Sequence, residues 1–402
     1  MQHRERVLTA LRHQEPDRVP IDLGGTDGST MMINAYRAFR RHLGLGPGEI
    51  HVADIFQQVV MVEEDVRQAL GVDVVPIFKE PDRWREEILP DGAPIQLPAK
   101  FRPQLRNDGS QIVLDDAGNA VLQAPKDGLY FDPVYAPLAD VSDSQDLDQY
   151  TSYIENYDWP FYLDKSLEQL AGNAKALRQN TDYLLVGQFG GHIFEAGRSL
   201  RGWDTFLIDL LVNPKLAQAL MDRVTEANIR HFERYAETVG RHVDVVAFNE
   251  DLGMQDRTLI SPELYRRMIK PYQKRLFSFA KSRCNAYLLL HSCGAVAPFI
   301  PDFIEMGVDA LNPVQVSAAG MDTRQLKKEF GQDIVFWGGG CDTQTVLPLG
   351  VPEDVQAEVK RRIDDLAPGG GFIFCPVHNV QDGVSSENLT ALYKTALEYG
   401  VY

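Results

Sequence analysis

The chain has only four cysteines in 402 residues, and this scarcity argues against a secreted disulfide scaffold. It also lacks any apolar run approaching the length of about 18 residues that a transmembrane helix needs. Its first residues lead into an amphipathic stretch and contain no apolar signal-peptide core. We therefore expect a cytoplasmic protein that does not enter a membrane.

Clustered positive charge is missing as well. The sequence has 40 Lys and Arg against 57 Asp and Glu, which gives a formal net charge of −17 at pH 7. Without a block of Lys or Arg, binding to nucleic acid or to an anionic membrane is not expected. The glycine-rich segment at 338–342 has no phosphate-loop lysine and no G-x-G-x-x-G pattern, which argues against nucleotide binding. A small-molecule substrate is expected instead.

What the chain does contain is a regular alternation of short apolar segments and amphipathic stretches, clearest after residue 180. Strands that are apolar throughout and separated by helices predict parallel βαβ units. Counting two earlier segments, the sequence predicts an α/β fold with the strand number of a (β/α)8 TIM barrel. The predicted strands are 19–23, 72–77, 183–188, 243–248, 286–291, 308–312, 334–337 and 372–374.

One stretch interrupts this alternation. Residues 80–145 contain repeated turn sequences with short alternating segments between them, which indicates a small β-rich insertion. The remainder, with 44% hydrophobic residues overall, is sufficient for one large core. We expect a single barrel domain over residues 1–402, with an N-terminal helical segment and the insertion at 80–145.

Polar and glycine-rich residues follow most of the later predicted strands. Barrel enzymes place their active sites at the C-terminal ends of the strands, whereas a doubly wound sheet usually binds its ligand at one switch point. The recurrence of polar segments after consecutive strands therefore favours the barrel. The residues at these strand ends that we assign to cofactor binding are Gln188, Asn312, Gln315, Asp342 and Asn379.

His291 and Cys293 close the apolar run at 286–290. Alternate residues of a strand point to the same face, so the imidazole and the thiol should project together beyond the strand end. Both groups are zinc-type ligands. Cys375 and His378 follow another strand, and either could supply a third ligand. Cys375 continues a buried strand and could instead be a core residue, while His378 lies further out in the loop.

An acidic pair, Glu250 and Asp251, follows the predicted strand at 243–248. One interpretation is a general acid or base, or a fourth metal ligand. The other is a cap at the N-terminus of the following helix.

Several motifs resemble the uroporphyrinogen decarboxylase superfamily, and they occur in the same order along nearly the whole chain outside the insertion. The resemblance implies a (β/α)8 barrel. The superfamily contains the decarboxylase of haem synthesis and also zinc-dependent methyltransferases that take a methyl group from a corrinoid protein. The matching segments are 4–20, 260–272, His-Ser-Cys-Gly at 291–294, Asp-Ala-Leu-Asn at 309–312, Pro-Val-His-Asn at 376–379 and Ser-Glu-Asn-Leu at 386–389.

The segment after the first predicted strand distinguishes the two branches. The decarboxylase carries Arg-Gln-Ala-Gly-Arg there, and its arginines hold the carboxylates of the substrate. This chain has Asp22 and Asp27 in that segment and no arginine, so a polycarboxylate would meet repulsion instead of paired hydrogen bonds. Asp54, in Ala-Asp-Ile-Phe, resembles the aspartate of the decarboxylase, although the downstream spacing differs. Glu250 stands where the decarboxylase has a serine.

The methyltransferase branch uses His-x-Cys and a later Cys before Glu-Asn-Leu. His291 and Cys293 match the first part, and counting back from Glu387 places the later position at His378, with Cys375 three residues earlier. The decarboxylase also has a histidine at this position. The resemblance therefore implies zinc bound by His291 and Cys293, with His378 or Cys375 as an altered third ligand.

We interpret the chain as a zinc-dependent methyltransferase that moves a methyl group between a corrinoid, either methylcobalamin or a corrinoid protein, and a small acceptor such as a thiol. Zinc with an open position keeps a bound thiol as the thiolate. Glu250, Asp251 and Asp54 are the candidate catalytic acids and bases. Two alternatives stay open: decarboxylation of a tetrapyrrole with Asp54 or His378 managing the proton, and a non-catalytic module that binds a corrinoid or tetrapyrrole.

Overall fold

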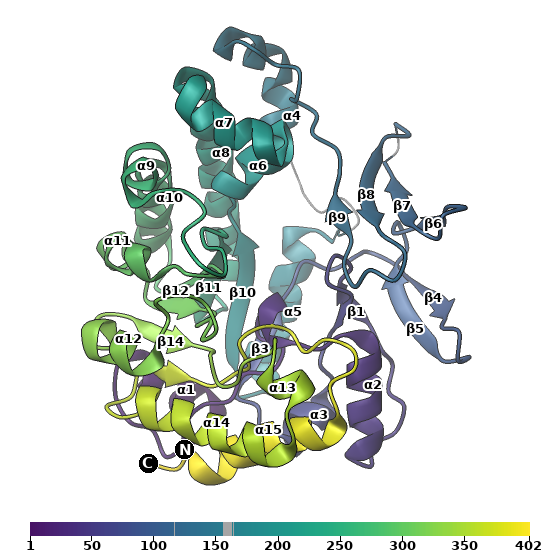
Figure 1. Ribbon diagram of the computed structural model, residues 1–402, viewed down its shortest axis with the longest axis vertical. Coiled ribbons are helices and arrows are strands. Elements are labelled where there is room, and N and C mark those ends of the chain that lie inside the picture. Colours follow the sequence, from purple (N-terminus) through teal and green to yellow (C-terminus); the bar gives the residue numbers. More distant parts are fainter. Residues whose placement is uncertain (116, 156–162, 164) are drawn as a thin grey trace.

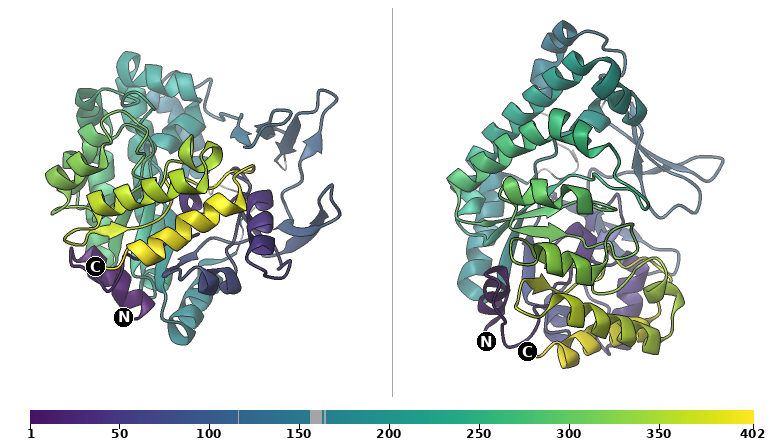
Figure 2. Two further views of the ribbon diagram at one scale, coloured as in Figure 1. Left: turned by 60° about the horizontal axis from the view of Figure 1, so that its bottom comes forward. Right: turned by 60° about the vertical axis from the view of Figure 1, so that its left-hand side comes forward.

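A computed structural model describes residues 1–115, 117–155, 163 and 165–402. Its centre is a seven-stranded sheet in which all neighbouring strands are parallel and follow one another in chain order. The curled sheet, covered by helices, has a TIM-barrel-like architecture (Figures 1 and 2). The strands are β3 (Val74–Ile77), β10 (Leu184–Gly190), β11 (Val245–Asn249), β12 (Tyr287–His291), β13 (Ala310–Asn312), β14 (Val335–Trp337) and β15 (Phe372–Ile373).

The predicted strand at 19–23 is not a regular strand, and this part of the prediction was wrong. It makes one parallel bridge, between Ile21 and Phe374. On its other side the Asp73 amide donates to the Ile21 carbonyl at 2.8 Å. Pro20 has no N–H to donate to a ladder, and the Ile21 amide bonds to the Asp73 carboxylate instead of to a strand carbonyl. The segment therefore lies between β15 and the residue before β3 without a continuous ladder.

Helices alternate with the strands from β10 onward, as the sequence predicts. The amphipathic stretch at 262–282 forms two helices, because Pro271 lacks an N–H and its ring clashes with a preceding carbonyl. The helices that surround the sheet are α1 (His3–Leu11), α2 (Ile33–His42), α3 (Glu64–Ala69), α5 (Leu167–Asn180), α6 (Phe194–Arg201), α7 (Trp203–Val212), α8 (Pro214–Tyr235), α9 (Pro262–Met268), α10 (Lys270–Arg283), α11 (Ile300–Glu305), α12 (Thr323–Phe330), α13 (Val346–Leu349), α14 (Pro352–Leu366) and α15 (Ser386–Tyr399).

The interior of the curled sheet is filled by side chains from alternate positions of its strands. Leu289, Ala310 and Trp337 belong to this inner cluster, and Val7 of α1 packs against it. Because side chains alternate along a strand, the residue two positions after Leu289, which is His291, faces the same interior. In the described residues, no helix has the length and apolarity needed to cross a membrane.

The stretch predicted as a β-rich insertion forms two small antiparallel sheets, which project at the right of Figure 1. A short hairpin of β1 and β2 precedes them, and the 3-10 helix at Ser144–Tyr150 and α4 follow. The hairpin consists of β1 (Val52–Asp54) and β2 (Val59–Val60), and α4 is Thr151–Glu155. The strands of the two sheets are β4 (Trp84–Ile88), β5 (Pro94–Pro98), β6 (Gln104–Leu105), β7 (Gln111–Leu114), β8 (Ala120–Ala124) and β9 (Asp132–Pro133).

Candidate metal centre

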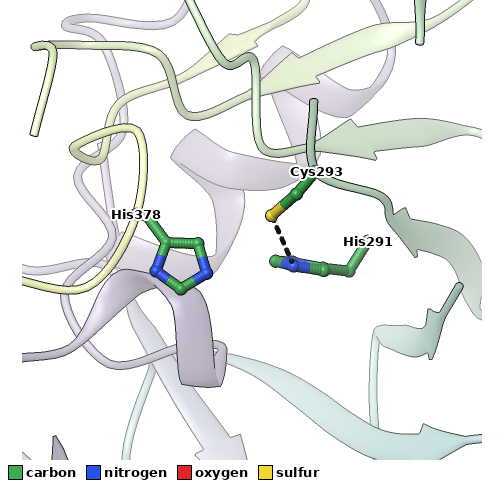
Figure 3. A group of neighbouring side chains, drawn as sticks. All are labelled: His291, Cys293 and His378. Atoms are coloured by element: carbon green, nitrogen blue, oxygen red, sulfur yellow. Dashed lines mark hydrogen bonds between the residues drawn. The ribbon is translucent and has the colours of Figure 1, made fainter. Parts of the chain in front are cut away.

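Three side chains from two strand ends converge at one point of the sheet's C-terminal edge (Figure 3). His291 ends β12, Cys293 follows it, and His378 lies in the loop after β15. One donor atom from each lies within 4.8 Å of the others, and Cys293 Sγ is 3.3 Å from His291 Nε2. The donors of a tetrahedral zinc site lie roughly 3.3–3.8 Å apart, given Zn–N and Zn–S bonds of about 2.0–2.3 Å. The donor set fits zinc with a small movement of His378.

The hydrogen bonds of His291 leave its metal-facing nitrogen unprotonated. Asn312 Nδ2 donates to the Trp337 carbonyl at 3.0 Å, so the amide presents its oxygen to His291 Nδ1, 2.7 Å away. Because Asn312 Oδ1 can only accept, Nδ1 carries the proton and the lone pair of Nε2 points toward Cys293. An orienting partner of this kind is typical of metal-binding histidines. Asn312, a predicted cofactor contact, thus lies directly behind the candidate ligands His291, Cys293 and His378, which we call the metal group.

Cys293 lies beside Asp251. Its backbone amide donates to Asp251 Oδ1 at 2.8 Å, and that oxygen is 4.0 Å from His291 Nε2. Burial and the charge of Asp251 raise the pKa of the Cys293 thiol well above its usual value. A metal would therefore have to displace the thiol proton on binding. Asp251 therefore lies next to both His291 and Cys293. Its role as a catalytic acid or base stays a prediction.

His378 and Cys375, the two candidates for third ligand, occupy different environments. His378 is part of the three-residue group, and burial together with the neighbouring His291 lowers the pKa of its imidazole, so it stays neutral and able to bind a metal. Cys375 is fully buried in the core, with Sγ 4.0 Å from Asn312 Nδ2. The geometry favours His378.

A hydrogen-bond network extends from His378 toward the insertion. The next residue, Asn379, donates to Gln57 Oε1 at 2.6 Å and accepts from the Tyr130 hydroxyl at 3.3 Å. Gln57 Nε2 donates to Asp54 Oδ2 at 3.3 Å, and burial raises the pKa of the Asp54 carboxyl. Two predicted residues, Asp54 and Asn379, are thereby connected. Tyr130 was not among the predicted residues, because in the sequence it belongs to the insertion and does not follow any predicted strand of the main sheet.

The acidic segment after residue 21 folds over the metal group. A Cβ added to Gly28 would lie 3.0 Å from His291 Cε1, a tight contact, so the backbone here packs closely against the imidazole. Burial, with a contribution from Asp54, raises the pKa of the neighbouring Asp27 to about 7. Burial raises the pKa of Asp22 to about 6. Asp27 thus lies next to the glycine that packs on His291, while the buried Asp22 accepts from Trp337 Nε1 at 2.8 Å.

Glu250 is buried and its carboxylate caps the start of α6. Its oxygens accept from the amides of Ile193 at 2.7 Å, Phe194 at 3.0 and 3.1 Å and Glu195 at 3.1 Å. Burial and the nearby Glu195 raise the pKa of Glu250 to about 7. These contacts match the predicted helix-cap alternative, except that the capped helix precedes Glu250 in the chain. A catalytic role for Glu250 stays a prediction.

The remaining predicted cofactor contacts bond mainly to backbone. Gln188 Nε2 donates to the Gly25 carbonyl at 2.7 Å, and Gln315 Oε1 accepts from the Gly294 amide at 2.8 Å. Asp342 accepts from two amides of the turn that follows it, at 3.1 and 3.2 Å. Gln188 and Gln315 position loops that border the metal group, and cofactor binding by all three stays a prediction.

Sequence reasoning missed a second charged pair at this edge of the sheet. His192 Nδ1 lies 2.5 Å from Glu195 Oε2. The other oxygen of Glu195 accepts from the Asp251 amide at 3.0 Å and from Arg198 at 3.2 Å. Although burial opposes ionisation, His192 lowers the pKa of Glu195 to about 2. The available signal was a histidine four residues after the predicted strand at 183–188, but its carboxylate partner is recognisable only once α6 is placed.

Comparisons with known proteins agree with this architecture. Residues 162–399 match the family described as Uroporphyrinogen decarboxylase (URO-D), as the resemblance implies. None of the curated proteins compared matches the chain in sequence.

Among solved structures, a methyltransferase from Methanosarcina mazei has a TM-score of 0.60 at 16% identity, with 99% of each chain covered. Xylanase 10B from Thermotoga petrophila has a TM-score of 0.38 at 14% identity, covering 63% of this chain and 90% of that chain. A B12-independent methionine synthase from Shewanella sp. W3-18-1 has a TM-score of 0.35 at 10% identity, covering 84% of both chains. The first match shows a shared fold, and the scores of the other two are too low to support an argument.

Proposed function

The chain belongs to the uroporphyrinogen decarboxylase family, and we propose that it is a zinc-dependent methyltransferase that moves a methyl group between a corrinoid and a small acceptor such as a thiol. The observation that carries the proposal is the donor set of His291, Cys293 and His378, with the Nε2 lone pair of His291 aimed at Cys293 Sγ. The fold shared with a methyltransferase from Methanosarcina mazei supports it.

His291, Cys293 and His378 would hold the zinc, whose contribution is to keep an acceptor thiol as a nucleophilic thiolate at its open position. The chain's own residues prepare that position. Asn312 fixes the tautomer of His291, and the low pKa of His378 keeps its imidazole neutral. Methylcobalamin or a corrinoid protein would supply or receive the methyl group across the same edge of the sheet.

We also infer that the segment at 19–23 completes a (β/α)8 barrel, since it bonds to Phe374 on one side and to Asp73 on the other. The sequence at 22–29 has Asp22 and Asp27 and no arginine, and the buried Asp22 carboxylate accepts from Trp337 Nε1 at 2.8 Å and from the Gly25 amide at 2.7 Å. Bringing a polycarboxylate tetrapyrrole there would leave its carboxylates without cationic partners in a desolvated site. The lack of an arginine in this segment therefore favours methyl transfer over the decarboxylation of uroporphyrinogen.

Metal analysis and a spectral assay test the proposal together. Purified protein should contain about one zinc per chain, and mixing it with methylcobalamin and 2-mercaptoethanol should change the corrinoid absorption spectrum. Cys293→Ser should lose both properties, and Cys284→Ser, at the opposite end of β12, should keep them. Protein that forms coproporphyrinogen rapidly from uroporphyrinogen, and loses this activity in Asp54→Asn, would contradict the proposal and favour the decarboxylase.

A further inference from the structure

The ion pair of His192 and Glu195 lies beside the metal group, but neither residue is one of the candidate ligands. We propose that this pair carries the proton of the methyl-transfer reaction: His192 takes the proton from an acceptor thiol as the thiol binds and becomes a thiolate, and returns it to sulfur in the reverse direction. The inference rests on the proposed function and adds to it the residues that handle the proton.

The pair has the geometry of an imidazole supported by a carboxylate. His192 Nδ1 and Glu195 Oε2 are 2.5 Å apart, so Nδ1 faces the carboxylate and Nε2 remains for a ligand. The His192 side chain is 41% exposed, which lets a substrate reach it and lets it exchange protons with water. Arg198 holds Glu195 from the other side at 3.2 Å.

The structure fixes this imidazole rather than leaving it on a free loop. The Glu250 carboxylate binds the amides of Ile193 and the first residues of α6, directly after His192. Asn228 Nδ2 donates to the His192 carbonyl at 2.9 Å. Glu250 thus positions His192 through the amides that follow it, which gives the buried carboxylate a role.

Two routes connect the pair to the metal group. On one side, Glu195 accepts from the Asp251 amide, and Asp251 accepts from the Cys293 amide at 2.8 Å. On the other side, the charge of His192 acts on Asp27, whose neighbour Gly28 lies against His291. The pair is therefore linked by hydrogen bonds to the segment of Asp251 and Cys293, and by charge to the segment of Asp27.

The charged groups around His192 favour its protonated form. Glu195 on α6, and Glu250 and Asp251 after β11, all raise the pKa of His192, although burial opposes them. Asp27 faces it from the segment before α2. A proton accepted by the imidazole would thus be stabilised by a carboxylate that is already ionised.

The proton and the electrons balance in this step. The sulfur lone pair forms the new S–CH3 bond, and the Co–CH3 bond breaks with its electron pair left on cobalt. The S–H bond breaks with its pair left on sulfur, and its proton goes to His192 Nε2. In the reverse direction the imidazolium returns the proton to sulfur, and no further oxidant or reductant is needed.

The proton released when a thiol binds tests the inference without an activity assay. Zinc-loaded protein would be titrated calorimetrically with 2-mercaptoethanol in buffers of different ionisation enthalpy, which gives the number of protons released per thiol. The pH is chosen where an NMR titration shows His192 to be neutral. The wild-type protein should release fewer protons than His192→Asn, by up to about one per thiol, because His192 retains them.

Two further variants complete the test. His42→Asn, an exposed histidine at the end of α2, should release as many protons as the wild type. Glu195→Gln keeps the size of the side chain and should release more than the wild type, so it decides the matter if His192→Asn does not fold. Equal proton release in the wild type, His192→Asn and Glu195→Gln would overturn the inference alone. Failure of zinc-loaded wild-type protein to bind the thiol would overturn the proposed function itself.

Discussion

The two histidines of the metal group are held in place by different means. His291 is the last residue of β12 and pairs in register with Asn249 of β11 and Asn312 of β13, so the sheet ladder and one amide fix it. His378 lies five residues after β15, and the residue next to it is held by Gln57 and by Tyr130 of the insertion region. The strand-borne side of the site is built locally, while the loop-borne side depends on segments more than 240 positions away in the chain.

This difference implies that the two sides would contribute unequally to the proposed zinc site. Backbone ladders are cooperative and remain in place when one side chain is changed, so the strand-borne ligands are preorganised. A loop ligand must be ordered by several weaker hydrogen bonds, each worth about 0.5–1.5 kcal/mol. The following changes test this contrast, from the largest expected effect to the smallest.

Cys293→Ser should have the largest effect, because it removes the strand-borne thiolate. We expect most of the zinc to be lost, a larger decrease in affinity than the roughly 10–100-fold typical of losing a supporting partner. Metal content per chain, measured by elemental analysis, checks this expectation. Cys284→Ser is the control, and equal metal content in the two variants would contradict the assignment.

His378→Ala should lower zinc affinity by less than Cys293→Ser does, because the loop side is less rigid. Cys375→Ala, in the core beside Asn312, should retain the metal and lower the unfolding free energy by about 1 kcal/mol through loss of packing. Competition with a chelator and denaturant unfolding provide the two measurements. The opposite pattern, with metal lost only in Cys375→Ala, would make Cys375 the third ligand.

Asn312→Ala leaves all three ligands in place but removes the acceptor for His291 Nδ1. We expect zinc affinity to fall by about 10–100-fold, because the imidazole can then rotate and change its tautomer. The measurement is the same chelator competition, with Asn180→Ala, exposed at the end of α5, as a control. An Asn312→Ala variant with wild-type affinity would show that the sheet ladder alone orients His291.

Tyr130→Phe should have the smallest effect, since it removes one hydroxyl at the far end of the network through Asn379. We expect a loss of about 0.5–1.5 kcal/mol at most, corresponding to at most about a tenfold decrease in zinc affinity. Calorimetric titration with zinc measures it. A decrease as large as that of Asn312→Ala would show that the loop side is as preorganised as the strand side.

Local sequence patterns predicted the part of the site that short-range geometry determines. The strand period places His291 and Cys293 on one face, and the structure has them 3.3 Å apart. Alternating apolar and amphipathic segments likewise predicted the parallel strands from β10 to β15 and the helices between them. The pattern failed at 19–23, where Pro20 and the Asp73 carboxylate replace ladder bonds.

By itself, the sequence determined the fold class and the strand-borne pair of candidate ligands, because both depend on residues a few positions apart. Only the tertiary structure placed the His378 side chain, and not Cys375, in the group with His291 and Cys293, and brought His192 to Glu195 beside Asp251. It also placed Glu250 at the start of α6. These outcomes depend on which loops meet at the edge of the sheet. That meeting is set by packing and by hydrogen bonds between distant segments, for which spacing along the chain carries no signal.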